Sequence, residues 1–229
     1  MNKTVKTIVE IALFLLCCFL VFLIYSSVME PVRFNKEQAK RTAVAVQRLK
    51  DIRTLQVAYK GENGKFTSTI DSLKNFYENG KMTIVMQVGS ADDSLSVVHT
   101  EAVKKANKKI TPQQLFEMYK AGDDKLVFSI ESKINVKDTL FNNRPDFCID
   151  SLNFIPFCGE PVIMESIIKM VSGVPVPLFE AKMPYRSLLK GLDNQLRINL
   201  DAERRDQNKY EGLQVGSVSA PNNNAGNWE

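Results

Sequence analysis

Residues 8–60 read IVEIALFLLCCFLVFLIYSSVMEPVRFNKEQAKRTAVAVQRLKDIRTLQVAYK, and the rest of the chain is organised around this stretch. Its first part, Ile8–Met29, is a run of 22 residues whose apolar character is interrupted only by one glutamate and two serines. As a helix this run would rise about 33 Å, enough to cross a bilayer hydrocarbon core of about 30 Å. We therefore expect one transmembrane helix at residues 8–29.

An uncleaved anchor fits this run better than a removed signal. A signal peptide has a shorter apolar core of about 7–15 residues and a cleavage site between small residues, for which Tyr25–Val28 is a weak match. Cys17 and Cys18 follow two leucines rather than small residues, so we read them as apolar helix residues and not as a lipoprotein signal.

The charges beside the span bear on its orientation. Lys3 and Lys6 precede it and several basic residues follow it, so the count of positive charges does not decide the topology. A short positive N-terminus before a single span usually stays in the cytoplasm. We expect residues 1–7 in the cytoplasm of a bacterium and the soluble part in the periplasm, with the anchor in the inner membrane.

The remaining two cysteines, Cys148 and Cys158, flank a short segment of the soluble part. An even pair of cysteines facing an oxidising compartment is typical of a disulfide, and we expect one here, with two buried thiols as the alternative. Zinc is not expected, because the soluble part has no second pair of cysteine or histidine ligands.

After the span, residues 30–60 have the pattern of a charged stalk helix. Pro31 cannot donate a helix hydrogen bond, so we expect a kink or a short break near Met29–Val32. Apolar or small residues then recur at steps of three and four and form one stripe, with Gly61 as the candidate residue that ends the helix. The stripe consists of Ala39, Ala43, Val46, Leu49, Ile52, Gln56 and Tyr59.

The end of this stalk carries a resemblance to a known family. Arg48–Lys60, then Gly-Glu-Asn-Gly64-Lys-Phe66-Thr67, resembles the stalk-helix end of the major pseudopilins of type II secretion systems, and Thr7-Ile-Val-Glu10-Ile is similar to the opening of mature pilins. The residue before Lys6 is Val5, so the glycine of the prepilin peptidase site is absent. The whole chain also resembles a family of membrane-anchored proteins from Bacteroidetes that end in Asn-Asn-Asn-Ala-Gly-Asn-Trp-Glu, which implies a cell-envelope location.

The pseudopilin resemblance implies an assembly function. Glu10 would act in the membrane, and the stalk face Ala43, Val46, Leu49 and Ile52 would contact other subunits. The implied partners are membrane lipid, other envelope proteins and further copies of the chain. The alternative is an anchored periplasmic domain that binds a ligand or scaffolds a complex.

The soluble part, residues 61–218, alternates short helical patterns with runs typical of strands, followed by an expected flexible tail at 219–229. This balance predicts an α+β domain with a mainly antiparallel sheet. We expect helices at Thr67–Tyr77, Glu101–Lys109, Pro112–Ala121 and from Pro184 to at least Leu192, and strands at Lys81–Val88, Lys125–Val136, Asp150–Phe157, Val162–Met170, Val174–Lys182 and Gly212–Val218.

No catalytic motif is visible in the 229 residues. The net charge of +4 is spread along the chain without a basic patch for nucleic acid. The single histidine, His99, has no identifiable orienting partner in the sequence and is read as a surface residue. Asp92-Asp93 and Asp123-Asp124 fall in polar loops and are read as solvated. We expect no enzyme, no cofactor, no metal site and no small-molecule substrate.

Overall fold

The computed structural model describes residues 3–229, so Met1 and Asn2 of the expected cytoplasmic N-terminus lie outside the described residues. The chain separates into two compact units. Unit 1 consists of Met1–Val57, Lys65–Ile70 and Cys148–Glu229, and unit 2 of Ala58–Gly64 and Asp71–Phe147. The fold class is α+β with antiparallel sheets, as predicted.

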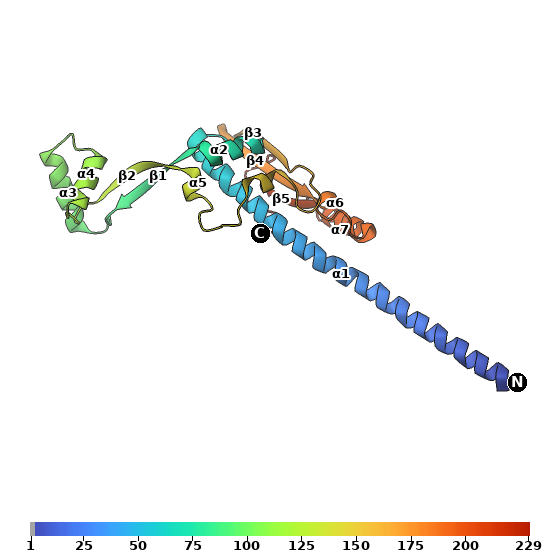
Figure 1. The fold of residues 1–229 in the computed structure, drawn as a ribbon. Helices are drawn as coiled ribbons and strands as arrows, with labels where there is room; N and C mark the ends of the chain where they lie inside the picture. Colours follow the sequence, from blue (N-terminus) through green and yellow to red (C-terminus); the bar gives the residue numbers. More distant parts are fainter. Residues whose placement is uncertain (1–2) are drawn as a thin grey trace. The chain divides into compact units, whose positions relative to one another are not determined.

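Helix α1, Lys3–Asn63, runs through unit 1 as far as Val57, its last residues belong to unit 2, and it is drawn in blue to cyan in Figure 1. It is α-helical on both sides of Pro31, so the break expected near that proline is not present. A proline removes a single hydrogen bond and costs about 3 kcal/mol inside a helix. The many turns on either side outweigh that local cost.

The two halves of α1 have different surroundings. In the N-terminal half large apolar side chains are exposed, and this part is long and apolar enough to cross a membrane. The second half packs on its own unit through a stripe spaced by three, four and eleven residues. The buried stripe consists of Phe34, Ala45, Leu49, Ile52 and Leu55.

The end of α1 differs from the expected one. Gly61 lies inside the helix, and the residue that follows the last turn is Gly64. Gly64 has a φ of 71° and donates its N–H to the carbonyl of Lys60 at 2.8 Å. Gly64 ends the helix because glycine adopts this left-handed conformation without a steric penalty.

Unit 1 contains a three-stranded antiparallel sheet of β3 (Ile163–Val171), β4 (Val174–Pro184) and β5 (Gly212–Gly216), in the order β3-β4-β5. The predicted hairpin is confirmed, with Ser172 and Gly173 at positive φ in its turn. Pairing of β4 with β5 begins only at Glu180. Pro175 and Pro177 precede that point, where one edge of the strand is open, as their missing N–H groups require, and Pro184 is the last residue of the strand.

One face of this sheet contacts α1 and the segment that follows it. The Phe66 ring lies 4.7 Å from that of Phe179 on β4. The fully buried Gln56 of α1 donates to the carbonyl of Thr67 at 2.6 Å and accepts from its N–H at 3.1 Å. This amide therefore fixes the returning chain beside the helix while satisfying its own buried polar atoms.

The connections of unit 1 depart from the sequence prediction in three places. Residues expected to form a strand at Asp150–Phe157 instead form the 3₁₀ helix η1, Ile149–Asn153, followed by an isolated bridge. The stretch after Pro184, where one helix to at least Leu192 was expected, forms two helices, α6 (Tyr185–Leu188) and α7 (Asn194–Asp206), with a loop between them. The third departure is the C-terminal tail, which had been expected to be free.

The tail is held against β5 and α1. The Gly216 N–H donates to the carbonyl of Ala225 at 3.0 Å, and Glu229 pairs with Arg53 of α1 at 2.7 Å. The Trp228 ring lies against Gly226, where a Cβ atom would come within 2.4 Å of it. The tail is thus part of unit 1, and Trp228 docks within the chain.

Unit 2 contains the last residues of α1 and, from Asp71 onward, α2 (Ile70–Asn79), and is built on a two-stranded ribbon. Strands β1 (Lys81–Val88) and β2 (Phe128–Asn135) pair antiparallel along their whole length. The helices α3 (Ser94–Ala106) and α4 (Pro112–Lys120) lie together at one end of this ribbon in Figure 1, and the short α5 (Val136–Thr139) follows β2. Their small core consists of Val88, Leu115, Leu126, Phe128 and Ile130.

The limits of the helices in unit 2 follow from their caps. Helix α3 starts earlier than predicted, because the Asp93 carboxylate accepts from the Leu95 N–H at 3.2 Å and caps it. Helix α4 starts where predicted, with Thr111 and Gln114 forming a reciprocal capping box ahead of a proline at the first position.

Candidate functional site

The predicted membrane residue, Glu10, has a partner in its own helix. Its Oε1 lies 3.9 Å from the Nζ of Lys6 one turn earlier, and both side chains are about two-thirds exposed. An exposed pair at this spacing contributes a few tenths of a kcal/mol in water. In a bilayer it would partly neutralise the glutamate at the edge of the span.

The predicted assembly face of the stalk is divided by the structure. Leu49 and Ile52 are fully buried in unit 1 and cannot contact another subunit, which corrects their assignment. Val46 is half-buried, whereas Ala43 is exposed. The stripe predicted from the sequence and the buried stripe share Leu49 and Ile52. Before Leu49 they differ, because Ala45 is buried and Ala43 is not.

Three arginines of α1 donate hydrogen bonds to the loops and the tail of unit 1. Arg41 donates to the carbonyls of Leu188 and Lys190 at 3.1 and 2.9 Å. Arg48 donates to the carbonyl of Phe154 at 2.6 Å, and Arg53 pairs with the C-terminal residue. Their long stems cross the packed face while each guanidinium satisfies loop carbonyls.

Cys148 and Cys158 are both free thiols, so the predicted disulfide is not present. The Cys148 side chain is exposed. The half-buried Cys158 sulfur instead lies within its own turn, 3.7 Å from the carbonyl oxygen of Ile155 and 3.5 Å from the amide nitrogen of Glu160.

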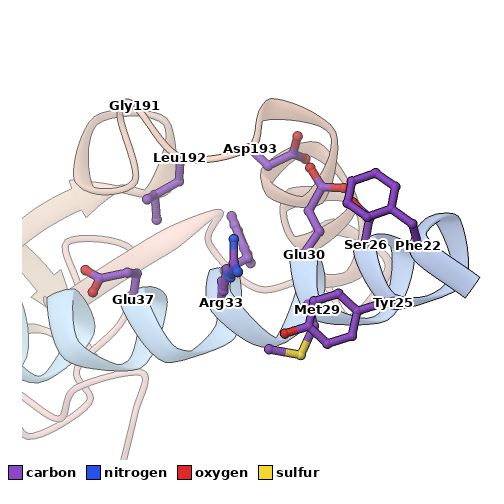
Figure 2. A pocket seen from close by; sticks show the side chains of 11 residues that line it. Phe22, Tyr25, Ser26, Met29, Glu30, Arg33, Glu37, Gly191, Leu192 and Asp193 are labelled. Atoms are coloured by element: carbon purple, nitrogen blue, oxygen red, sulfur yellow. The ribbon is translucent and has the colours of Figure 1, made fainter. Parts of the chain in front are cut away.

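A hollow of about 520 Å³ lies where the apolar part of α1 meets the loop between α6 and α7. Its lining includes the apolar side chains of Phe22 and Met29, the ring of Tyr25 and several charged side chains. Figure 2 shows the side chains of Glu30 and Arg33 extending from α1 toward the loop that carries Leu192 and Asp193.

The charged groups of this hollow are almost unpaired within the described part of the chain. Glu30, Arg33 and Glu37 line it without a hydrogen bond or ion pair to any described residue. Asp193 uses one carboxylate oxygen, Oδ1, to cap α7 by accepting from the Leu196 N–H at 2.7 Å. Charges of both signs therefore face one space without neutralising each other.

A second hollow, of about 680 Å³, lies beside α7 and the end of β4. Its wall carries an excess of positive charge, with two carboxylates and four basic residues, and also includes the ring of Tyr210. The basic residues are Arg186, Arg197, Arg205 and Lys209.

Asp201 is the unusual group of this second hollow, since the residue is only 7% exposed. Its Oδ2 accepts from Arg197 at 2.6 Å, but its Oδ1 is buried without a hydrogen-bond partner among the described residues. Burial raises the pKa of the Asp201 carboxyl group above its usual range, against the opposing effect of Arg197.

In unit 2, the histidine that seemed to lack a partner in the sequence has one. The Nε2 atom of His99 on α3 lies 2.9 Å from the Oδ2 of Asp123, which follows α4. Neighbouring Thr100 bonds to the backbone of Ser96 and Val127. The pair links the end of α4 to α3, and the described contacts add no nucleophile to it.

Comparisons of this chain with family models, with curated proteins and with solved structures found no match.

Proposed function

We propose that this protein is a single-pass, non-enzymatic protein of the bacterial inner membrane that works as a pseudopilin-like subunit of a secretion or filament assembly. The observation that carries the proposal is that α1 combines an exposed apolar segment with a segment that packs in the soluble part. Its first half is apolar and exposed, while its second half is built into the core of unit 1. A contact made between spans in the membrane would therefore be transmitted directly to the soluble part.

The exposed side of α1 supplies the surface for such contacts. Beyond the span it retains Ala43 and the apolar side chains of Val32, Val44 and Val57, which are 39–52% exposed. Glu10 would then act at the membrane edge together with Lys6. Exposed apolar side chains spread along one long helix favour packing against other helices more than they favour binding of a small ligand.

The assembly is tested by oxidative crosslinking in intact membranes, since Cys17 and Cys18 are exposed on the span. We expect a ladder of disulfide-linked multimers in a variant whose other two cysteines are serine. Co-purification with an assembly ATPase or a polytopic platform protein would support the secretion assignment. A monomer at every oxidant concentration would overturn it.

The role of Glu10 is tested in the same assay. Glu10→Leu should weaken crosslinking while leaving membrane insertion unchanged, and Lys6→Gln serves as the matched control for the loss of one charge of the pair. If Glu10→Leu leaves both insertion and the multimer ladder intact, the glutamate has no part in assembly.

The proposed periplasmic orientation is supported by the short, basic N-terminus and is tested by thiol labelling. Cys148 is an exposed free thiol of the soluble part. A membrane-impermeant maleimide should label it in spheroplasts without lysis, and Cys148→Ser should remove that label. Labelling that requires lysis would place the soluble part in the cytoplasm.

A second candidate function is an anchored ligand-binding domain, and the hollow beside α7 favours it. Its basic wall fits a small anion such as inorganic phosphate. Phosphate should raise the melting temperature of the full chain above that in chloride at equal ionic strength, and Arg186→Gln should reduce the shift. No shift in either protein would exclude this candidate.

A further inference from the structure

The hollow between α1 and the loop of Leu192 has a defined depth if α1 crosses the bilayer with Met29 at the end of the span. Each residue advances the helix by about 1.5 Å, and the head-group layer on each side is roughly 5–7 Å thick. Tyr25 then lies about 6 Å inside the hydrocarbon. Glu30 and Arg33 lie about 1.5 and 6 Å outside it, level with the lipid head groups.

The composition of the hollow changes at the same level. Its inner part is apolar and aromatic, as is typical of side chains at the membrane boundary. Its outer part holds three carboxylates and one guanidinium, from Glu30, Glu37, Asp193 and Arg33. A molecule with hydrocarbon at one end and charges of both signs at the other matches this change from an apolar to a charged lining.

The charges select among lipid head groups. Three carboxylates against one arginine favour a ligand with a cationic group that can donate several hydrogen bonds, and a primary ammonium has three N–H donors. The arginine fits a phosphate. The trimethylammonium group of phosphatidylcholine has no N–H, and phosphatidylglycerol has no cation. Among the described residues no acidic cluster is arranged to hold a metal ion.

We propose that this hollow binds one phosphatidylethanolamine molecule of the outer leaflet. The ammonium group lies by the carboxylates of Glu30 and Asp193, and Glu37 adds negative charge about 10 Å further along α1. The phosphate pairs with Arg33, and an acyl chain follows the Tyr25 side of α1. The bound lipid neutralises charges that the protein itself leaves unpaired. This assignment rests on α1 being a membrane anchor and does not depend on assembly with other subunits.

The test is native mass spectrometry of the full chain released from nanodiscs that contain equal parts of phosphatidylethanolamine, phosphatidylcholine and phosphatidylglycerol. We expect adducts of one phosphatidylethanolamine to exceed those of either other lipid about fivefold, the ratio that one partly exposed ion pair supplies. Glu30→Gln combined with Glu37→Gln should abolish the preference. Arg33→Gln should reduce the adduct of phosphatidylethanolamine without creating a preference for another lipid.

The controls are Glu78→Gln and Lys50→Gln, which remove exposed charges that do not line the hollow and should leave the preference unchanged. Resistance to alkaline extraction from membranes, measured first, establishes the anchor independently of the lipid site. An inserted protein with equal adducts of all three lipids would overturn the proposal. So would a preference that survives both glutamate substitutions.

Discussion

Replacing Leu49 by alanine distinguishes whether this residue of α1 stabilises the core of unit 1 or contacts another subunit. Leu49 is 0% exposed within unit 1. Removing its three outer carbons forfeits about 2.4 kcal/mol at about 0.8 kcal/mol per buried methylene, and the cavity left behind brings measured Leu→Ala costs to about 2–5 kcal/mol. We expect the free energy of unfolding of unit 1 to fall by about 3 kcal/mol.

The assay is urea unfolding of the full chain in mild detergent, followed by the fluorescence of the single tryptophan, Trp228, which packs within the same unit. At a slope of about 2 kcal/mol per molar urea, the midpoint should fall by about 1.5 M. Val57→Ala is the matched control on the same helix, because Val57 is 49% exposed and its truncation should change stability by less than about 0.5 kcal/mol.

The outcome that refutes this reasoning is specific. If Leu49→Ala unfolds at the same urea concentration as Val57→Ala but loses the crosslinked multimers, then Leu49 is a contact between subunits and not part of the core.

Three further predictions concern other parts of the chain. Gly61→Ala should raise the free energy of unfolding by up to about 1 kcal/mol, since Gly61 is helical and a Cβ there meets nothing within 4 Å. Gly64→Ala should lower it by about 1 kcal/mol, because the φ of 71° is unfavourable for alanine. Thermal melting followed by circular dichroism compares the two variants. Burial raises the pKa of Asp201, so the wild type should lose stability as pH rises above about 3.9 toward the folded-state pKa, and Asp201→Asn should lack that loss in unfolding measured from pH 3.5 to 7. Arg48→Met retains the apolar stem but removes the 2.6 Å bond to the Phe154 carbonyl, and should lower stability by about 1 kcal/mol in the same urea assay; an unchanged midpoint would show that this bond contributes nothing.

Patterns with a fixed period were predicted well from the sequence. The strand at Lys81–Val88 and the hairpin around Ser172-Gly173 were found where expected, because alternation and turn residues are local properties. The start of α4 was equally local, since its cap and its proline are neighbours. The α3 start was missed because the single capping aspartate lay in a stretch that otherwise resembled a loop.

The charged groups of the hollow between α1 and the loop of Leu192 come from residues far apart in the chain, whereas those of the hollow beside α7 all fall within residues 186–211. Glu30 and Asp193 line one hollow although 163 positions separate them, and no local pattern relates them. The partner of His99 was likewise not predicted. Asp123 is one of two adjacent loop aspartates, and nothing in the sequence indicates that this loop lies beside the helix that carries His99.

The sequence by itself determined the long apolar N-terminal helix, its charged helical continuation, the α+β class and the main hairpin, because hydrophobic length and periodicity act within a few turns or one strand. Tertiary structure alone decided which side of the stalk became core. Alanines and valines occur on both sides of α1, so composition did not distinguish Ala43 from the buried Ala45. The choice depended on the sheet face containing Phe179 and on the loops whose carbonyls accept from Arg41 and Arg48, and these contacts form only when distant segments meet.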